Sequence, residues 1–146
     1  MNSGIQRIFS LITILAVGGI VVSSVSLQHH FATSKTAYCD FGNTFNCDIV
    51  NRSEYSSVLG IPVALIGLVG YAAVLALSTL YRERQGAPSL IFGGAGAGLA
   101  FALYLTYIEA RVLGVWCIVC LSSLAIISVL TLVSGGLWFK SRESSL

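Results

Sequence analysis

The stretch VWCIVCLSSLAIISVLTLVSGGLWF (residues 115–139) contains no Lys, Arg, Asp or Glu. An α-helix needs about 20 mostly apolar residues to cross a hydrocarbon core of about 30 Å. This stretch is therefore predicted to be a transmembrane helix. Two cysteines, Cys117 and Cys120, lie three residues apart at its start. A cysteine pair at the head of a membrane helix guides the interpretation of the rest of the chain.

Three further uncharged apolar runs are long enough to span a membrane, at residues 8–27, 58–80 and 89–108. The chain of 146 residues is 55% hydrophobic and only 10% charged, and its mean hydropathy is +0.86. These values are typical of an integral membrane protein. The sequence predicts an all-α, four-helix membrane bundle forming a single domain over residues 1–146. The one sizeable polar loop is residues 28–57.

The first apolar run could also be a secretory signal peptide. It is longer than the roughly 7–15 residues of a signal-peptide apolar region, and it lacks an Ala-x-Ala cleavage site. A transmembrane helix is therefore favoured. His29 and His30 follow this run, and adjacent helical residues point about 100° apart. They are interpreted as polar residues at the membrane interface rather than as a metal site. The run Gly93–Gly98 is interpreted as a surface for close helix packing.

Basic residues predict the orientation of the bundle. With four spans, both termini and the turn after the second span share one side. That side carries five basic residues in short segments, namely Arg7, Arg82, Arg84, Lys140 and Arg142. The other side carries Lys35, Arg52 and Arg111. Cytoplasmic segments are enriched in Lys and Arg, so the first side is predicted to be cytoplasmic. All four cysteines then lie on the exoplasmic face, where disulfides persist.

A cysteine pair spaced i, i+3 has chemistry of its own. Its Cβ atoms lie roughly 5–6 Å apart on a helix, which is near disulfide geometry. A helix N-terminus stabilises a thiolate, and Cys-x-x-Cys pairs have a depressed thiol pKa. The functional interpretation is an exchangeable dithiol at Cys117 and Cys120. The structural alternative is two small apolar core residues. A second pair, Cys39 and Cys47, lies in the polar loop.

Three other classes of ligand are disfavoured. The net charge is only +2 and no basic stripe exists, which argues against nucleic acid. A structural zinc site commonly has both cysteine pairs spaced by two to four residues, whereas seven residues separate Cys39 from Cys47. Covalent haem attachment needs a histidine after the second cysteine, and Leu121 stands there.

The order of these motifs resembles the vitamin K epoxide reductase family over nearly the whole chain. The resemblance is carried by Cys39 and Cys47 with seven residues between them, by Ser53, by Gly60-Ile61-Pro62 before the second apolar run, and by Cys117-Ile118-Val119-Cys120. Quinone oxidases of the DsbB type also have four helices and two cysteine pairs. In those proteins, however, the Cys-x-x-Cys pair comes first.

The resemblance implies a four-helix bundle around a quinone, either ubiquinone or menaquinone, and no metal. Cys39 would be attacked by a reduced thioredoxin-fold, DsbA-like partner. Cys47 would then attack Cys117, and Cys120 would pass two electrons to the quinone. Ser53 would support the loop that caps the site. The protein would be a thiol:quinone oxidoreductase that supports disulfide formation in a bacterial inner membrane.

Two departures from the family pattern separate the alternatives. Animal members carry a quinone-binding tyrosine at the position of Leu124, so its absence argues against the alternative of a eukaryotic-type epoxide reductase. Many bacterial members continue into a thioredoxin-like domain, whereas this sequence ends at Leu146, so a separate partner protein is expected. A third interpretation is a non-catalytic membrane scaffold with structural disulfides.

Overall fold

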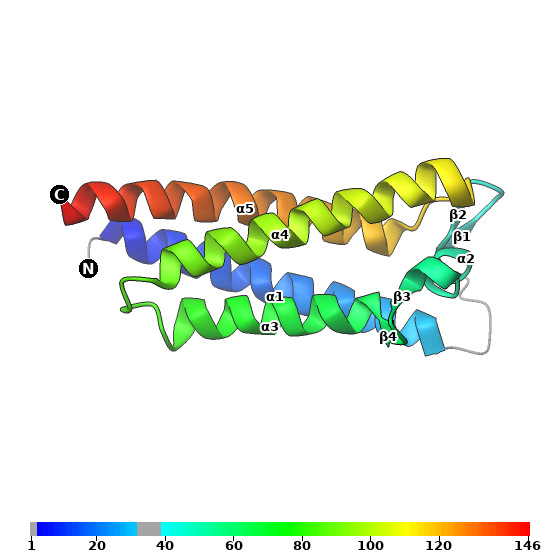
Figure 1. Ribbon diagram of the computed structural model, residues 1–146, viewed down its shortest axis with the longest axis horizontal. Helices are drawn as coiled ribbons and strands as arrows, with labels where there is room; N and C mark the ends of the chain where they lie inside the picture. Colours follow the sequence, from blue (N-terminus) through cyan, green and yellow to red (C-terminus); the bar gives the residue numbers. More distant parts are fainter. Residues whose placement is uncertain (1–2, 32–38) are drawn as a thin grey trace.

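The computed structural model describes residues 3–31 and 39–146. Long helices run alongside one another parallel to the longest axis of the molecule (Figure 1). Their bounds are Ser3–Phe31 for α1, Val63–Thr79 for α3, Ala87–Ile108 for α4 and Ile118–Ser145 for α5. Helix α1 packs against α3 and α5, and α4 packs against α5 and α3. The predicted all-α class is therefore confirmed.

The short elements gather at one end of these helices (Figure 1). They are the hairpin β1 (Asp40–Phe41) and β2 (Phe45–Asn46), helix α2 (Cys47–Asn51), the 3-10 turn η2 (Glu54–Ser56), and the hairpin β3 (Ser57–Val58) and β4 (Ile61–Pro62). A π-helical turn, η3 (Glu109–Leu113), extends α4 toward the same end. We call this end the cysteine end, because Cys39, Cys47 and Cys117 are buried there. The start of α1 and the end of α5 lie at the opposite end.

The outer surfaces of the helices suit lipid. Three helical segments, Ser3–Phe31, Ala87–Leu113 and Ile118–Ser145, are long and apolar enough to cross a membrane. Large apolar side chains point outward from all four long helices, including Ile14, Val69, Leu103 and Leu132. Such exposure is unusual on the surface of a water-soluble monomer but normal against hydrocarbon. The protein is therefore an integral membrane protein.

Helix α3 begins later than its apolar run. The run begins at Val58, but the helix starts at Val63 because residues 57–62 form the β3–β4 hairpin. Leu59 and Gly60 turn this hairpin with φ values of 53° and 81°. Glycine adopts such values at no steric cost, and a hairpin turn of two residues commonly needs them. Pro62 then occupies the N-cap position directly before α3, with a φ of −58°.

The polar segment expected as a loop over residues 28–57 is largely folded. Its first residues belong to α1, which continues to Phe31. Residues 39–57 form β1, β2, α2 and η2 and enter β3. Lys35, one of the basic residues used to predict orientation, lies outside the described residues. These short elements, from β1 to β4, thus form a structured cover over one end of the helices, which we call the cap.

The buried core between the helices is closely packed at Tyr71. A Cβ atom added to Gly19 of α1 would overlap the Tyr71 ring. The ring is buried against α1, and its hydroxyl lies 3.2 Å from Ser123 Oγ on α5. Small residues allow membrane helices to approach in this way. Gly19 therefore provides the space that lets Tyr71 link α3 to α1 and α5.

Gly19→Ala is expected to destabilise the protein by about 1–3 kcal/mol, because the added methyl overlaps a ring held between three helices. Gly18→Ala is the matched control. Its Cβ would meet only Ile126 Cδ1, at an ordinary 3.8 Å. Thermal unfolding of both variants in the same detergent measures the difference. Equal unfolding midpoints for the two variants would contradict this account of the packing.

Candidate functional site

Cys39 and Cys47 form a disulfide at the cysteine end, with a Cα–Cα distance of 5.6 Å. The β1–β2 hairpin between them brings the two residues together, and its turn includes Gly42 at a φ of 66°. Cys47 is the first residue of α2, whose N-terminus is capped by the Asn46 side chain accepting from Ile49 N at 3.1 Å. The disulfide is thus held between a tight hairpin and a capped helix.

The hairpin is bonded directly to the segment that precedes Cys117. Asn46 N donates to Trp116 O at 3.0 Å, and Trp116 N donates to Thr44 O at 2.8 Å. These bonds form a parallel bridge between Phe45 and Trp116. Residues 115 and 116 are consequently not helical, and α5 begins at Ile118 instead of at the start of its apolar run. Cys47 directly follows the bonded residue Asn46, and Cys117 directly follows the bonded residue Trp116.

Cys117 is the N-cap residue of α5, and its Sγ accepts from Cys120 N at 3.2 Å. A hydrogen bond from the Cys120 thiol lowers the pKa of the Cys117 thiol below its ordinary value. Burial acts in the opposite direction, and the Cys120 backbone N–H adds to the lowering. Cys117 is fully buried, whereas Cys120 is partly exposed. The two thiols therefore differ in environment, and Cys117 is the member favoured as a thiolate.

Asn51 joins the two cysteine pairs. Its Nδ2 donates to Cys47 O at 2.9 Å and to Cys117 Sγ at 3.6 Å. Its Oδ1 accepts from Ser26 Oγ of α1 at 2.6 Å. The side chain is only 5% exposed, so these bonds are shielded from water. The bond to sulfur also contributes to lowering the pKa of Cys117.

Asn51→Leu is expected to raise the pKa of the Cys117 thiol, because a donor to the thiolate is lost. The fraction of thiolate at neutral pH then falls. Ultraviolet thiolate absorbance, titrated in protein whose Cys39–Cys47 disulfide is intact, reports on Cys117 and Cys120, and Cys117→Ser supplies the background. Asn43→Leu, an exposed change in the hairpin turn, is the matched control. An unchanged titration in Asn51→Leu would remove Asn51 from this role.

The C-terminal end of α1 contacts α2 through two histidines. His29 is buried, and its Nδ1 lies 3.6 Å from Asp48 Oδ1. His30 Nδ1 lies 2.6 Å from Asn51 O. The interpretation of these histidines as interfacial residues is thus wrong for His29, because α1 continues into the folded cap and buries it there. Both histidines hold the short helix that carries Cys47 and Asn51.

A cavity of about 580 Å³ lies between α1, α3, α4 and α5, below the cap. Its walls are mostly apolar, and Cys120 is the cysteine that lines it. Polar groups reach it from Ser123 on α5, from Tyr71 on α3 and from Glu109. Small-molecule sites commonly have volumes of about 300–1,000 Å³ and combine apolar walls with a few polar groups. The volume and lining of the cavity suit a small apolar molecule beside Cys120.

The glycine-rich run of α4 shapes this cavity. Gly94, Ala97 and Gly98 line it. A Cβ on Gly98 would also come within 3.3 Å of Ile127 Cδ1, whereas one on Gly94 would meet nothing within 4 Å. The expectation of close helix packing is therefore met at Gly98 and at Ala95, which is buried in the core between the helices. At Gly93, Gly94 and Gly96 the missing side chain leaves open space.

Ser53 lies at the polar rim of the cavity. It precedes η2, its Oγ donates to Val50 O at 2.8 Å, and its carbonyl accepts from Ser56 Oγ at 2.7 Å. These bonds tie α2 to η2. Leu124, by contrast, packs against the core cluster. The hydroxyl groups next to Cys120 on the cavity wall come from Ser123 and Tyr71.

The structure brings together the four cysteines and the residues around Ser53 in one region. Asn51 and Glu109 belong to the same region but were not among the predicted site residues. Asn51 was one of several polar residues in a loop, and Glu109 stood in a short connection between spans. A carboxylate at the end of an apolar run was the available signal for Glu109. Over residues 3–31 and 39–146, no three His, Cys, Asp or Glu side chains converge as a metal site.

Comparison with protein families agrees with this geometry. The sequence model of the vitamin K epoxide reductase family matches residues 10–134, which include α3, α4, the whole cap and most of α1 and α5. The match thus covers both cysteine pairs and the cavity. The chain belongs to the vitamin K epoxide reductase family, and it is a membrane oxidoreductase of a family that uses quinone-type substrates.

Proposed function

We propose that the protein is a membrane thiol:quinone oxidoreductase that oxidises a thioredoxin-fold, DsbA-like protein and so supports disulfide formation. One observation carries the proposal. Cys39, Cys47 and Cys117 share a buried cluster with Cys120, and Cys120 also lines the apolar cavity. Electrons can therefore pass through cysteines from the cap to the cavity.

The relay begins in the cap. A thiolate of the reduced partner attacks Cys39, and Cys47 leaves as a thiolate. The second thiol of the partner then releases Cys39 and leaves the partner with a disulfide. Cys47 attacks Cys117 of the Cys117–Cys120 disulfide, and Cys120 leaves. Cys39 finally attacks Cys47, which restores the Cys39–Cys47 disulfide and frees Cys117.

The relay ends at the cavity. Cys117 and Cys120, now reduced, form a disulfide and give up two electrons. A quinone bound beside Cys120 accepts the two electrons and takes up two protons, one from the thiol of the pair and one from water, to become a quinol. The arrangement described above, with Cys39 joined to Cys47 and with free thiols at Cys117 and Cys120, corresponds to the state before this last step. The apolar walls suit either ubiquinone or menaquinone.

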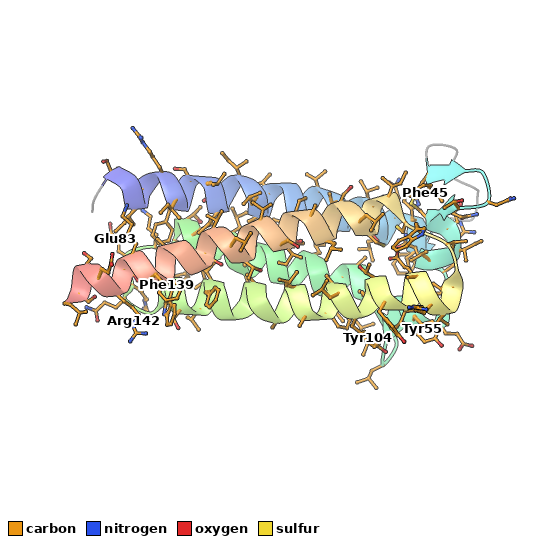
Figure 2. The ribbon with its side chains drawn as sticks, turned by 90° about the horizontal axis from the view of Figure 1, so that it is seen from above. Phe45, Tyr55, Glu83, Tyr104, Phe139 and Arg142 are labelled. Carbon is orange, nitrogen blue, oxygen red and sulfur yellow. A yellow bond between two sulfur atoms is a disulfide. The ribbon has the colours of Figure 1, made fainter. Side chains whose placement is uncertain are left out.

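The proposed membrane arrangement has four spans in a single domain over residues 1–146. Helix α3 has 17 residues, and at 1.5 Å per residue it covers about 26 Å. The β3–β4 hairpin continues from it into the cap. Exposed Tyr104 and Phe139 lie toward opposite ends of the bundle (Figure 2), as aromatic residues do at the two membrane interfaces.

We further propose that the cap faces the exoplasmic side of a bacterial inner membrane and that both termini are cytoplasmic. Arg142 and Glu83 lie at the end opposite to Phe45 and Tyr55 (Figure 2). Most of the basic residues belong to segments at the Arg142 end, and the positive-inside rule assigns that end to the cytoplasm. Ser53 has a supporting role in the cap, and the cysteines meet their partner in an oxidising compartment.

The test uses the full chain in lipid nanodiscs with a short-chain benzoquinone or naphthoquinone. Adding a reduced thioredoxin-fold protein is expected to reduce one quinone for each disulfide formed. Absence of quinone reduction, or partner oxidation that needs no quinone, would contradict the proposal. Vitamin K epoxide is offered in a parallel reaction. Its turnover would favour the eukaryotic type of activity, against the expectation from Leu124.

A further inference from the structure

Glu109 is a carboxyl group in an apolar setting. It is 1% exposed, at the point where α4 passes into the π-helical turn η3. The turn ends at Gly114, whose φ is 67° and whose N–H donates to Glu109 O at 2.9 Å. A carboxylate removed from water costs several kcal/mol unless other groups compensate. Its retention inside a membrane protein suggests a function.

The side chain of Glu109 faces the Cys117–Cys120 pair. Its Oε2 accepts from Cys117 N at 3.2 Å, and the carboxyl group also interacts with the Cys120 side chain. Glu109 also lines the cavity together with Cys120. The carboxyl group thus neighbours the reacting cysteine pair and also borders the proposed quinone site.

Of the ionisable groups in this region, Glu109 is the one placed to act as a base for the Cys120 thiol. Among the described residues, the ionisable groups that interact with its carboxyl are the two thiols of Cys117 and Cys120. Arg111, on the same turn, is exposed. Three other ionisable side chains line the cavity, namely His30, Tyr55 and Tyr71. His30 bonds the Asn51 carbonyl, Tyr71 bonds Ser123, and Tyr55 is largely exposed.

We propose that Glu109 accepts the proton of the Cys120 thiol when the pair is oxidised and delivers it to the quinone. This inference rests on the proposed function. It adds a proton path to the electron path, and both start at Cys120. Glu109 is then a catalytic residue of the quinone-reducing step, since it contacts the reacting thiol.

The proposed step balances as follows. Before the step, Cys117 is a thiolate, Cys120 is a thiol and Glu109 is a carboxylate. The S–H bond of Cys120 breaks and its proton moves to Glu109, while the Cys117–Cys120 S–S bond forms. The pair loses two electrons, and the quinone gains them. One proton reaches the quinone from Glu109 and the second comes from water, so that a quinol forms and Glu109 returns to a carboxylate.

Glu109→Gln separates this role from a structural one. The glutamine amide oxygen can still accept from Cys117 N, and the side chain keeps its size, but it is not a base. Glu109→Asp keeps the base on a shorter side chain. Glu83→Gln is the matched control, because Glu83 is exposed at the opposite end of the bundle (Figure 2).

The experiment follows a single turnover. Each full-length protein is reduced with dithiothreitol, desalted and mixed with a short-chain benzoquinone from pH 5.5 to 9. Thiol loss is read by alkylation and gel shift. Glu109→Gln is expected to slow oxidation of the pair by at least about 100-fold at pH 7. The rate should then rise about tenfold for each pH unit, as hydroxide replaces the missing base. Glu109→Asp should recover part of the rate, and Glu83→Gln should match the wild type.

The outcomes distinguish the two proposals. If the wild-type pair is not oxidised by the quinone at any pH, the proposed function fails. If the wild-type pair is oxidised but Glu109→Gln reacts at the same rate, or is slowed without a change in pH profile, the proton role of Glu109 is overturned while the proposed function stands. Thermal unfolding of each variant shows that folded proteins are being compared.

Discussion

Replacing Cys120 by serine is expected to stop quinone reduction and to leave Cys47 and Cys117 joined by a disulfide. Without Cys120, Cys117 has no partner within its own pair. It lies in the same buried cluster as Cys47, and the Asn51 amide bonds both residues. Attack of Cys117 on the Cys39–Cys47 disulfide then frees Cys39 and has no onward step. The rate of quinone reduction should fall by at least about 10³-fold.

Peptide mapping can detect this trapped disulfide. Trypsin cleavage leaves Cys39 and Cys47 in the peptide of residues 36–52 and leaves Cys117 in that of residues 112–140. The linked peptides should appear in Cys120→Ser, and oxidised glutathione should drive the link to completion in Cys39→Ser/Cys120→Ser. The matched control Cys47→Ser/Cys120→Ser should lack it. A link through Cys39 in that control, or none in any variant, would contradict the order of the relay.

The helical layout could be predicted from sequence because lipid imposes a simple rule. A backbone in hydrocarbon has to satisfy its own hydrogen bonds, so long uncharged runs become helices. Residues 89–108 therefore correspond closely to α4, which spans Ala87–Ile108. The rule does not apply where the chain leaves the lipid. At residues 58–62 an apolar sequence forms a hairpin, because Leu59 and Gly60 turn the chain.

The cysteines of the candidate site could be found from their spacing, but the groups that tune them could not. Asn51 precedes Cys117 by 66 residues and reaches it only through the pairing of Phe45 with Trp116. Glu109 faces Cys117 because the π turn carries the chain back toward α5. Contacts of this kind depend on tertiary structure. Likewise, sequence alone does not show whether the space beside Gly94 is filled by a neighbouring helix or belongs to a cavity.

Cys47→Ala is expected to separate the two halves of the relay. Reduced thioredoxin-fold partner should no longer be oxidised, with a rate at least about 10³-fold below that of the wild type, because Cys39 cannot pass electrons onward alone. The cavity and the pair at Cys117 and Cys120 are unchanged. A reduced Cys47→Ala protein mixed with a short-chain quinone should therefore still lose the Cys117 and Cys120 thiols in one turnover.

Thr44→Ala is the matched control for Cys47→Ala, because Thr44 is an exposed residue of the same hairpin and contributes its carbonyl to the Trp116 bond. It should retain both reactions. Partner oxidation that persists in Cys47→Ala would mean that partners reach Cys117 directly. Loss of the quinone reaction as well would mean that Cys47 shapes the cavity. Retention of the quinone reaction alone is the result that assigns Cys47 to the partner side of the relay, where it forms the disulfide with Cys39 and carries electrons to Cys117.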